Sequence, residues 1–467
     1  MNRKEFFKVS AAASLASLLS PLSAYAEKFE SEGKKVKVAV IGCGSVSTQY
    51  FPHISKCPYV EIVACCDIKP DRAQKAAKQY NIPKWYKHID DMLSGSKFDL
   101  MLTLTDMQVH GELNRKALMA GRNVWSEKPL ANSYKEGKEL YDLATSKGLR
   151  IWGAPAVVNS PQFAFMAEQI NKGTLGNLAC AHGHYGHEGP SWSAFFYEPL
   201  GGSMPDLGVY NIATLTGLLG PAKSVVAMTT IVTPERTVDD KGKIKVREED
   251  NAMIIMEHEK GVLSHIECGF NYFDPYGHLG KGQEKATISL YGSHGNMHMV
   301  GYDWAPNGVD LSTMDHPVPQ RFVPDTNGYV WQEGASDISK HMALNTEPRI
   351  NVEHALHVLE IIEAARKDDI SAIDLLHRAG EKLGEGIATM IHLFNPDMVV
   401  IGGEIVQAGD LMLVPVQQAI NKYALARMRG HCELKMSNLG VYSAILGTLM
   451  MVMEHLYDDT ECEYSLY

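Results

Sequence analysis

Short apolar runs alternate with amphipathic segments in the first third of the chain. The runs at residues 38–41, 60–66, 98–105 and 123–126 are brief, largely apolar and bounded by glycine or polar residues, which is typical of buried parallel strands. Between them, residues 71–80 and 113–120 have the pattern of helices. The alternation predicts a right-handed parallel βαβ sheet, whose functional groups collect at the C-terminal ends of its strands.

The pattern changes after about residue 156, where apolar and polar positions alternate with period two. Residues 178–185, 225–232, 252–257, 262–270 and 286–291 read as strands separated by glycine turns. This alternation predicts an antiparallel sheet with one covered face. It also places Cys180, His182 and His184 on one face of the first of these strands.

A glycine-rich turn follows the first strand and predicts a dinucleotide site. Gly42 permits a tight turn, Gly44 lets a pyrophosphate approach the backbone, and Ser47 lets the next helix lie close. The phosphates are expected beside Ser45 and Val46, where the helix N-terminus favours an anion. Asp67 ends the second strand, where a carboxylate binds the adenosine ribose. We therefore predict NAD, with NADP less favoured because a carboxylate repels a 2′-phosphate.

Composition narrows the class of protein. The 467 residues exceed the size of one domain, and the 45% hydrophobic content is that of a globular protein. The formal net charge of -11 argues against nucleic-acid or anionic-membrane partners. The eight cysteines show no C-x-x-C spacing, so we predict neither a disulfide framework nor a metal site.

The N-terminus has the pattern of an export signal. Arg3, Lys4 and Lys8 precede an apolar stretch at residues 9–19, and residues 24–26 (Ala-Tyr-Ala) form a small-x-small cleavage site. We therefore predict a signal peptide over residues 1–26 and a periplasmic or secreted mature chain with no membrane attachment. Residues 2–8 also resemble the twin-arginine motif, with lysine as the second basic residue, which implies export in the folded state.

One motif relates the chain to a known family. Glu127-Lys128-Pro129 follows the fourth predicted strand, after residues 99–105, His110 and residues 120–124. In this order they resemble the Gfo/Idh/MocA oxidoreductases over about residues 36–366. The resemblance implies an NAD-binding Rossmann domain (36–155), an α+β substrate domain with a largely antiparallel sheet (156–366), and oxidation or reduction of a hydroxyl on a sugar or polyol. The cofactor contacts it implies are Gly42, Gly44, Ser45, Val46, Asp67, Thr105, His110, Glu127 and Lys128.

The catalytic residues implied by the resemblance are Lys128, Asp206 and Tyr210. Residues 201–210 (Gly-Gly-Ser-Met-Pro-Asp-Leu-Gly-Val-Tyr) resemble a family helix that carries an acid and a histidine beside the nicotinamide. Here tyrosine stands in place of the histidine, and its reference pKa is near 10. The identity of the base therefore stays open between Tyr210 with a pKa lowered by Lys128 and a nearby histidine.

Three histidines and an aromatic cluster are candidates for the substrate pocket. His182, His184 and His187 supply ligand types for a metal, but the family chemistry needs none, and they equally suit hydrogen bonds to a sugar or a structural role. His184, His187 and Trp192 are the predicted substrate contacts. Aromatic packing in the core is the alternative for Trp192.

The last hundred residues have a different character. Residues 379–388 and 394–403, followed by residues 408–410 and 439–447, resemble the C-terminal part of ROK-type sugar kinases and repressors. The kinase's phosphate loop, catalytic aspartate segment and zinc motif are missing, so we predict no kinase activity. Residues 367–467 are expected to be a partial α/β tail that serves as an oligomerising module or is the remnant of a fusion.

Together these patterns predict an exported NAD-dependent sugar or polyol oxidoreductase that forms a homo-oligomer. Two other functions fit the same sequence. One is a glycosidase that uses tightly bound NAD for transient oxidation and elimination, and the other is a sugar-binding protein without catalysis. The sequence names neither the sugar nor the carbon that reacts.

Overall fold

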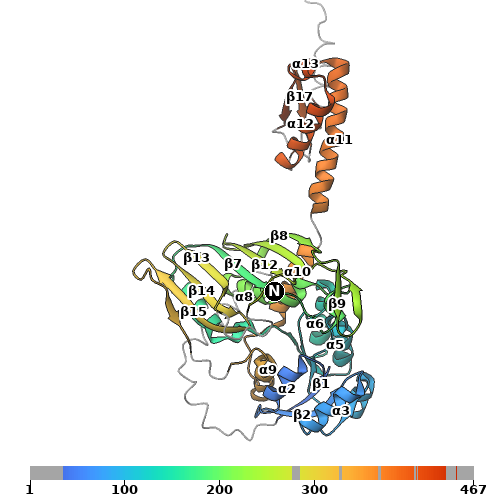
Figure 1. The fold of residues 1–467 in the computed structure, drawn as a ribbon, viewed down its shortest axis with the longest axis vertical. Helices are drawn as coiled ribbons and strands as arrows, with labels where there is room; N and C mark the ends of the chain where they lie inside the picture. The colour runs from blue at the N-terminus through green and yellow to red at the C-terminus, as the bar shows by residue number, and fades with distance from the viewer. Residues whose placement is uncertain are drawn as a thin grey trace, which may run out of the picture. The chain divides into compact units, whose positions relative to one another are not determined.

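The computed structural model describes residues 35–275, 284–324, 329–366, 370–403, 406, 409–437 and 449. The predicted signal peptide and most of the chain after residue 437 lie outside the described residues. The chain divides into two units, residues 1–367 and 368–467, coloured from blue to orange and from orange to red in Figure 1. No helix among the described residues is long and apolar enough to cross a membrane.

A parallel sheet of six strands forms the first part of the larger unit, in the order β3-β2-β1-β4-β5-β6. This confirms the predicted Rossmann sheet. The central strands are buried on both faces, because one core packs α2, α3 and α9 against the sheet and another packs α4, α5, α6 and α10. The strands are β1 (Val36–Ile41), β2 (Val60–Cys66), β3 (Trp85–Tyr86), β4 (Leu100–Thr103), β5 (Asn123–Ser126) and β6 (Ile151–Gly153), and the helices are α2 (Ser47–Ile54), α3 (Pro70–Gln79), α4 (Ile89–Gly95), α5 (His110–Met119), α6 (Tyr134–Ser146), α9 (Glu333–Leu344) and α10 (Val352–Arg366).

A mixed sheet of eight strands forms the second part, in the order β16-β15-β14-β13-β7-β12-β11-β8. All neighbouring pairs are antiparallel except β12 with β7, so the prediction of a largely antiparallel α+β domain is confirmed. The strands are β7 (Leu178–Gly186), β8 (Ala222–Thr230), β11 (Asn251–His258), β12 (Leu263–Gly269), β13 (Ala286–Gly292), β14 (Gly295–Tyr302), β15 (Ala305–Thr313) and β16 (Gln320–Phe322), with α7 (Pro161–Asn171), α8 (Val209–Leu219) and the hairpin β9 (Glu235–Val238) and β10 (Gly242–Lys245).

Helix α8 joins the two parts. It is apolar almost all round and packs on β7, β12 and β13, while α10 packs on α8, β8 and α6. The inner face of the large sheet is therefore covered by α8, and on its outer face the described side chains Val226, Met228, Met253 and Ile255 of β8 and β11 are exposed. This places Asp206, just before the N-terminal end of α8, beside Lys128, which follows β5 of the Rossmann sheet.

The second unit has a small core of its own. Helix α11 (Ile370–Phe394) packs along α12 (Asp410–Tyr423), next to α13 (Ala426–Arg429) and two parallel strands, β17 (Met398–Ile401) and β18 (Glu433–Met436). Ile387, Ile391, Met412, Val416 and Ile420 are buried at its centre. Met398 and Val400 of β17 are exposed, as the predicted lack of a covering lobe implies.

Candidate active site

The turn between β1 and α2 has the geometry that the glycine pattern predicted. Gly42 has φ of +92°, and a Cβ there would lie 2.3 Å from the Leu104 carbonyl oxygen, so only glycine fits. Ser47 is buried and donates its hydroxyl to the Gly44 carbonyl at 2.7 Å. Ser45 is exposed and Val46 half-buried at the start of α2, where helix N–H groups favour an anion.

Asp67 closes this turn from the neighbouring strand. Its two carboxylate oxygens accept the backbone N–H groups of Cys43 and Lys69, each at 2.8 Å. A carboxylate has further lone pairs, so it keeps the capacity to accept a ribose hydroxyl. Arg72 of α3 also belongs here, since its Nη1 lies 3.1 Å from the position of a Cβ on Gly44. Sequence reasoning missed Arg72, which lies on the polar side of a helix and follows no motif.

Two further cofactor candidates lie behind the strand ends. His110 is buried, with Nδ1 2.8 Å from the Pro129 carbonyl oxygen and Nε2 3.0 Å from the Thr105 carbonyl oxygen. Burial lowers the pKa of His110. Both ring nitrogens thus face the chain's own carbonyl groups, and His110 supports the Thr105 and Lys128 loops instead of facing a ligand.

Glu127 is also buried within this supporting layer. Its Oε1 accepts the Tyr50 hydroxyl at 2.6 Å, and its Oε2 accepts the backbone N–H of Lys128 at 3.0 Å. The Tyr50 hydroxyl accepts the indole N–H of Trp125 at 3.3 Å. The carboxylate therefore orients the turn that presents the Lys128 side chain.

Lys128 and Asp206 meet across the two parts of the unit. Lys128 Nζ lies 2.6 Å from Asp206 Oδ1 and donates to the Asp206 backbone carbonyl at 2.7 Å. The two side chains are 11% and 10% exposed. Asp206 lies on a π-helix, Met204–Gly208, which runs directly into α8. A single π-turn of this kind is frequent at functional sites.

Tyr210 joins this pair through its ring. Lys128 Nζ lies 5.2 Å from the ring centroid, within the range of a cation–π contact. Burial, followed by the charge of Glu127, raises the pKa of Tyr210 well above 10. The proposal that Lys128 lowers this pKa is therefore wrong, and the tyrosine keeps its proton at neutral pH.

Beside Tyr210 the structure forms a small cavity with aromatic walls. Glu127 supplies the charged group, and the aromatic side chains come from four separate segments: Tyr50, Tyr210, Trp304, Tyr329 and Trp331. Sequence reasoning missed four of these five, because no periodic pattern connects α2 with the segments around residues 304 and 330.

The loop from β7 to the π-helix forms another side of the site. His187 is buried between the rings of Tyr185 and Phe270, and Trp192 packs edge-on against Phe196 at 5.4 Å. Of these two predicted substrate contacts, His187 is thus packed into the core and Trp192 is partly buried against it. Gln108 of the Rossmann part donates to the Phe195 carbonyl at 2.8 Å and so ties this loop to the Rossmann part.

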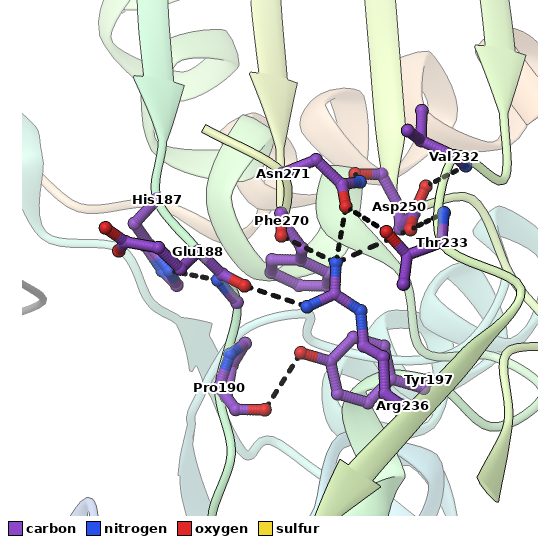
Figure 2. Close-up of polar contacts among 11 residues, drawn as sticks. His187, Glu188, Pro190, Tyr197, Val232, Thr233, Arg236, Asp250, Phe270 and Asn271 are labelled. Carbon is purple, nitrogen blue, oxygen red and sulfur yellow. Dashed lines mark hydrogen bonds and ion pairs between the residues drawn. The ribbon is translucent and has the colours of Figure 1, made fainter. Parts of the chain in front are cut away.

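Figure 2 shows how Arg236 of β9 holds the start of this loop. Its guanidinium donates to the carbonyl groups of Glu188 and Phe270 at 2.8 and 2.6 Å and to Asn271 Oδ1 at 2.7 Å, and it lies 5.0 Å from the Tyr197 ring centroid. Asp250, which is buried beside it, accepts the N–H groups of Val232 and Thr233. Arg236 therefore bonds the segments that follow β7 and β12 directly, and it lies 3.6 Å from Asp250, just before β11.

His184 is placed away from the site, which corrects its prediction as a substrate contact. Alternation along β7 turns Ala181, Gly183 and Tyr185 inward and leaves His182 and His184 on the outer face. On that face His184 Nδ1 pairs with Glu267 Oε1 at 2.5 Å, and the ring also contacts Lys285. The ring centroid of Tyr185, in contrast, lies 6.0 Å from that of Tyr210. The shared face of His182 and His184 was predicted, but not which face the core would cover.

Comparison with known proteins identifies the family. The family model for NAD-binding Rossmann-fold oxidoreductases of the Gfo/Idh/MocA type matches residues 36–154, and the model for the Gfo/Idh/MocA C-terminal domain matches residues 163–298. Together they span more than half of the chain. The chain belongs to the Gfo/Idh/MocA oxidoreductases. It is accordingly an NAD(P)-dependent oxidoreductase, as the Glu-Lys-Pro motif predicted.

Several relatives of this Gfo/Idh/MocA protein carry names of activities. Trans-1,2-dihydrobenzene-1,2-diol dehydrogenase of Bos taurus is 22% identical over 70% of this chain and 95% of its own. The NADP-dependent scyllo-inositol 2-dehydrogenase of Bacillus subtilis is 21% identical over 71% and 96%. A levoglucosan dehydrogenase solved with NADH and levoglucosan has a TM-score of 0.63 at 18% identity, covering 72% of this chain and 98% of that one, which shows a shared fold.

The tail also has a family match. The ROK family model matches residues 331–455, which confirms the predicted ROK resemblance and begins earlier than the expected residue 370. The matched range includes α9 and α10, which pack within the larger unit against β1, α6 and α8.

Proposed function

We propose that this protein transfers hydride between NAD and a hydroxyl-bearing carbon of a cyclic polyol or sugar. The Lys128–Asp206 pair carries the proposal, because it places an ammonium group at the C-terminal edge of the Rossmann sheet, where the family's cofactor binds. The turn at Gly42, the Asp67 carboxylate and Arg72 are the groups that would hold the dinucleotide. A bound nicotinamide would supply the hydride acceptor or donor.

Lys128 has the donors that an alcohol substrate requires. An ammonium carries three N–H groups, and Asp206 takes two of them through its carbonyl and Oδ1. The third is available to a substrate hydroxyl. In the oxidising direction, this donor stabilises the alkoxide that develops as the hydroxyl loses its proton. Asp206 keeps the ammonium in place and balances its charge.

Tyr210 is not assigned the role of the general base. Because its pKa lies well above 10, its phenol stays protonated at neutral pH, so it can donate a hydrogen bond but does not serve as the base. Its ring contacts the Lys128 ammonium and, with Trp304, forms part of the aromatic wall. The proton from the substrate is therefore assigned to the Asp206 carboxylate by way of Lys128: as the substrate hydroxyl gives its proton to Lys128, the ammonium passes one of its own protons to Asp206 Oδ1.

The cavity itself holds about one water molecule, so it is the aromatic side chains beside Lys128 that support a ring-shaped substrate. Aromatic faces pack against the C–H face of a cyclic molecule, while a few polar groups fix its orientation. The names of the relatives agree, since a cyclic diol, an inositol and levoglucosan are all cyclic compounds with hydroxyl groups. Of the two predicted contacts at the loop side of the site, the partly buried Trp192 remains part of this proposal, whereas His187 is packed into the core.

NAD is the proposed cofactor. Asp67 places a carboxylate at the end of β2, which binds free ribose hydroxyls and repels a 2′-phosphate. Arg72 is the group that opposes this preference, since it lies beside Gly44. Solved relatives include complexes with NADH and with NADP, so the comparison of the two cofactors is a necessary part of the test.

The test is hydride transfer by the purified protein with a panel of cyclic polyols, pyranoses and glycosides. A net change in NADH absorbance that depends on one of these compounds supports the proposal. Glycoside cleavage without net NADH change would assign the glycosidase function instead. Binding of a sugar without either reaction would leave only the sugar-binding function.

We also propose a homo-oligomer that buries the outer face of the eight-stranded sheet. Cross-strand neighbours Met228 and Met253, and Val226 and Ile255, lie on this face with Leu263. These five side chains are 49% to 68% exposed. A contiguous apolar patch of this kind marks an interface. Light scattering should show a smaller particle for Met228→Lys, and Met314→Lys, at an exposed methionine after β15 and outside this patch, serves as the control.

Export remains a proposal as well. The basic residues, apolar stretch and Ala-Tyr-Ala site at the N-terminus support it. N-terminal sequencing of protein recovered from the periplasmic or secreted fraction should begin near Glu27. Recovery of uncut protein from the cytoplasm would contradict it.

A further inference from the structure

A glycine turn leads directly into the π-helix that carries Asp206. Gly202 has φ of +103°, and a Cβ there would lie 2.3 Å from Glu249 Oε1 and 2.5 Å from Arg366 Nη2. Gly201 is packed as tightly, because its Cβ would lie 2.5 Å from the Phe195 carbonyl oxygen. The turn therefore rests against the Glu249 and Arg366 side chains with no room for a larger residue.

Glu249 binds the backbone at the start of the π-helix. Its Oε1 accepts the Met204 N–H at 3.1 Å, and its backbone carbonyl accepts the Ser203 N–H at 2.9 Å. The first N–H groups of a helix have no partner within the helix. Here the Glu249 carboxylate satisfies the Met204 N–H and also interacts favourably with the positive end of the helix dipole.

Arg366 holds Glu249 and the turn at the same time. Its Nε and Nη2 lie 3.2 and 3.0 Å from Glu249 Oε2, and Nη2 also donates to the Gly201 carbonyl. Glu249 is buried, so its charge needs this partner. The planar guanidinium fork makes these contacts together, which a lysine ammonium does not.

We infer that Arg366, acting through Glu249, is a positioning residue that keeps Asp206 against Lys128. Met204, which Glu249 binds, lies two residues before Asp206. The Asp206 backbone carbonyl and Oδ1 both bind Lys128, so a shift of the π-helix moves both contacts. This inference rests on the proposed function for its effect on catalysis. It also means that Arg366, the last residue of α10 and next to the boundary between the two units, supports the active site of the larger unit.

The first test measures the turn itself and needs no substrate. In the full-length protein, hydrogen exchange of the amides at residues 201–208 should be about tenfold faster or more in Arg366→Met, and intermediate in Arg366→Lys. Arg150→Met is the matched control, because Arg150 makes a two-fold contact with Glu347 at 3.0 and 2.6 Å on the exposed surface. Unchanged exchange at 201–208, or the same increase in the control, overturns the inference.

The second test separates positioning from a general loss of stability. With a substrate from the panel, Arg366→Met should lower kcat by about tenfold or more and leave the Kd for NADH unchanged. In an Asp206→Asn background the same change should have no further effect on kcat, because the effect acts through Asp206. Faster exchange with unchanged kcat, or additive losses in the double variant, overturns the positioning role. Absence of hydride transfer in the parent would instead overturn the proposed function, and the exchange test would still decide whether the Arg366 contact holds the turn.

Discussion

The Lys128–Asp206 pair offers the most direct perturbation of the site, through Lys128→Ala. The change removes the ammonium that the structure places 2.6 Å from Asp206 Oδ1. We expect hydride transfer to fall by at least about a hundredfold, the low end for a positioned acid–base group. That loss corresponds to about 2.7 kcal/mol in activation free energy.

The same variant should lose stability for a separate reason. Removing one member of a buried ion pair leaves an uncompensated charge, at a cost of about 3–5 kcal/mol. Because Lys128 and Asp206 keep about a tenth of their surface exposed, we expect about 3 kcal/mol, at the lower end of that range. The free energy of unfolding, measured in urea, reports this directly.

A double variant distinguishes the two effects. Lys128→Ala with Asp206→Ala removes both charges, so much of the lost stability should return, whereas hydride transfer should not. Lys116→Ala is the control, since it breaks an exposed ion pair with Asp90 at 3.3 Å and should cost at most about 1 kcal/mol. Lys128→Ala activity within about threefold of the parent, at intact NADH binding, would remove Lys128 from the mechanism.

Three further predictions concern the cofactor, Asp303 and the tail. Purified protein should bind NAD about tenfold tighter than NADP, a difference of about 1.4 kcal/mol in binding free energy, and Arg72→Ala should widen this ratio. Equal or tighter binding of NADP in a calorimetric titration would refute the role of Asp67. Burial raises the pKa of Asp303 from 3.8 to about 6, so its contribution to stability is fully present below pH 3.8 and is lost as pH rises through 6. Between pH 5 and pH 8, the free energy of unfolding of Asp303→Asn, measured in urea, should therefore rise by about 1–2 kcal/mol relative to that of the parent. A difference that does not change with pH would contradict this. Deleting residues 370–467 should leave the Kd for NADH within about threefold, because every residue assigned to the site lies before 367, whereas loss of NADH binding in a folded truncated protein would show that the tail contributes to the site.

The local pattern of residues predicted most of the Rossmann part of this protein. Strands buried on both faces must be nearly continuous apolar runs, and a tight turn before a helix must use glycine where φ is positive, so β1, β2, β4, β5 and Gly42 could be read directly. The Glu-Lys-Pro motif and the Gly201–Tyr210 segment pointed to the family because their order along the chain is itself distinctive. The resemblance of the tail to the ROK family was recognised in the same way, from the order of its motifs along the chain.

Tertiary structure decided which way side chains face and what surrounds them. The period-two pattern of β7 put His182 and His184 together, but α8 covers the opposite face, so Tyr185 lies near the site and His184 does not. The aromatic cavity wall joins residues from α2 and from segments near 304 and 330, and no sequence period links them.

The chemistry of Tyr210 shows the same division. Its position beside Asp206 was predicted from the motif, but its protonation depends on burial, which is a property of the packed site. The Arg366–Glu249 contact is likewise invisible in the sequence, since the two residues lie on α10 and just before β11. The sequence by itself determined the strands, the glycine turn and the reacting residue types. Only the packing of α8 and α10 between the two sheets determined their distances, their burial and therefore their charges.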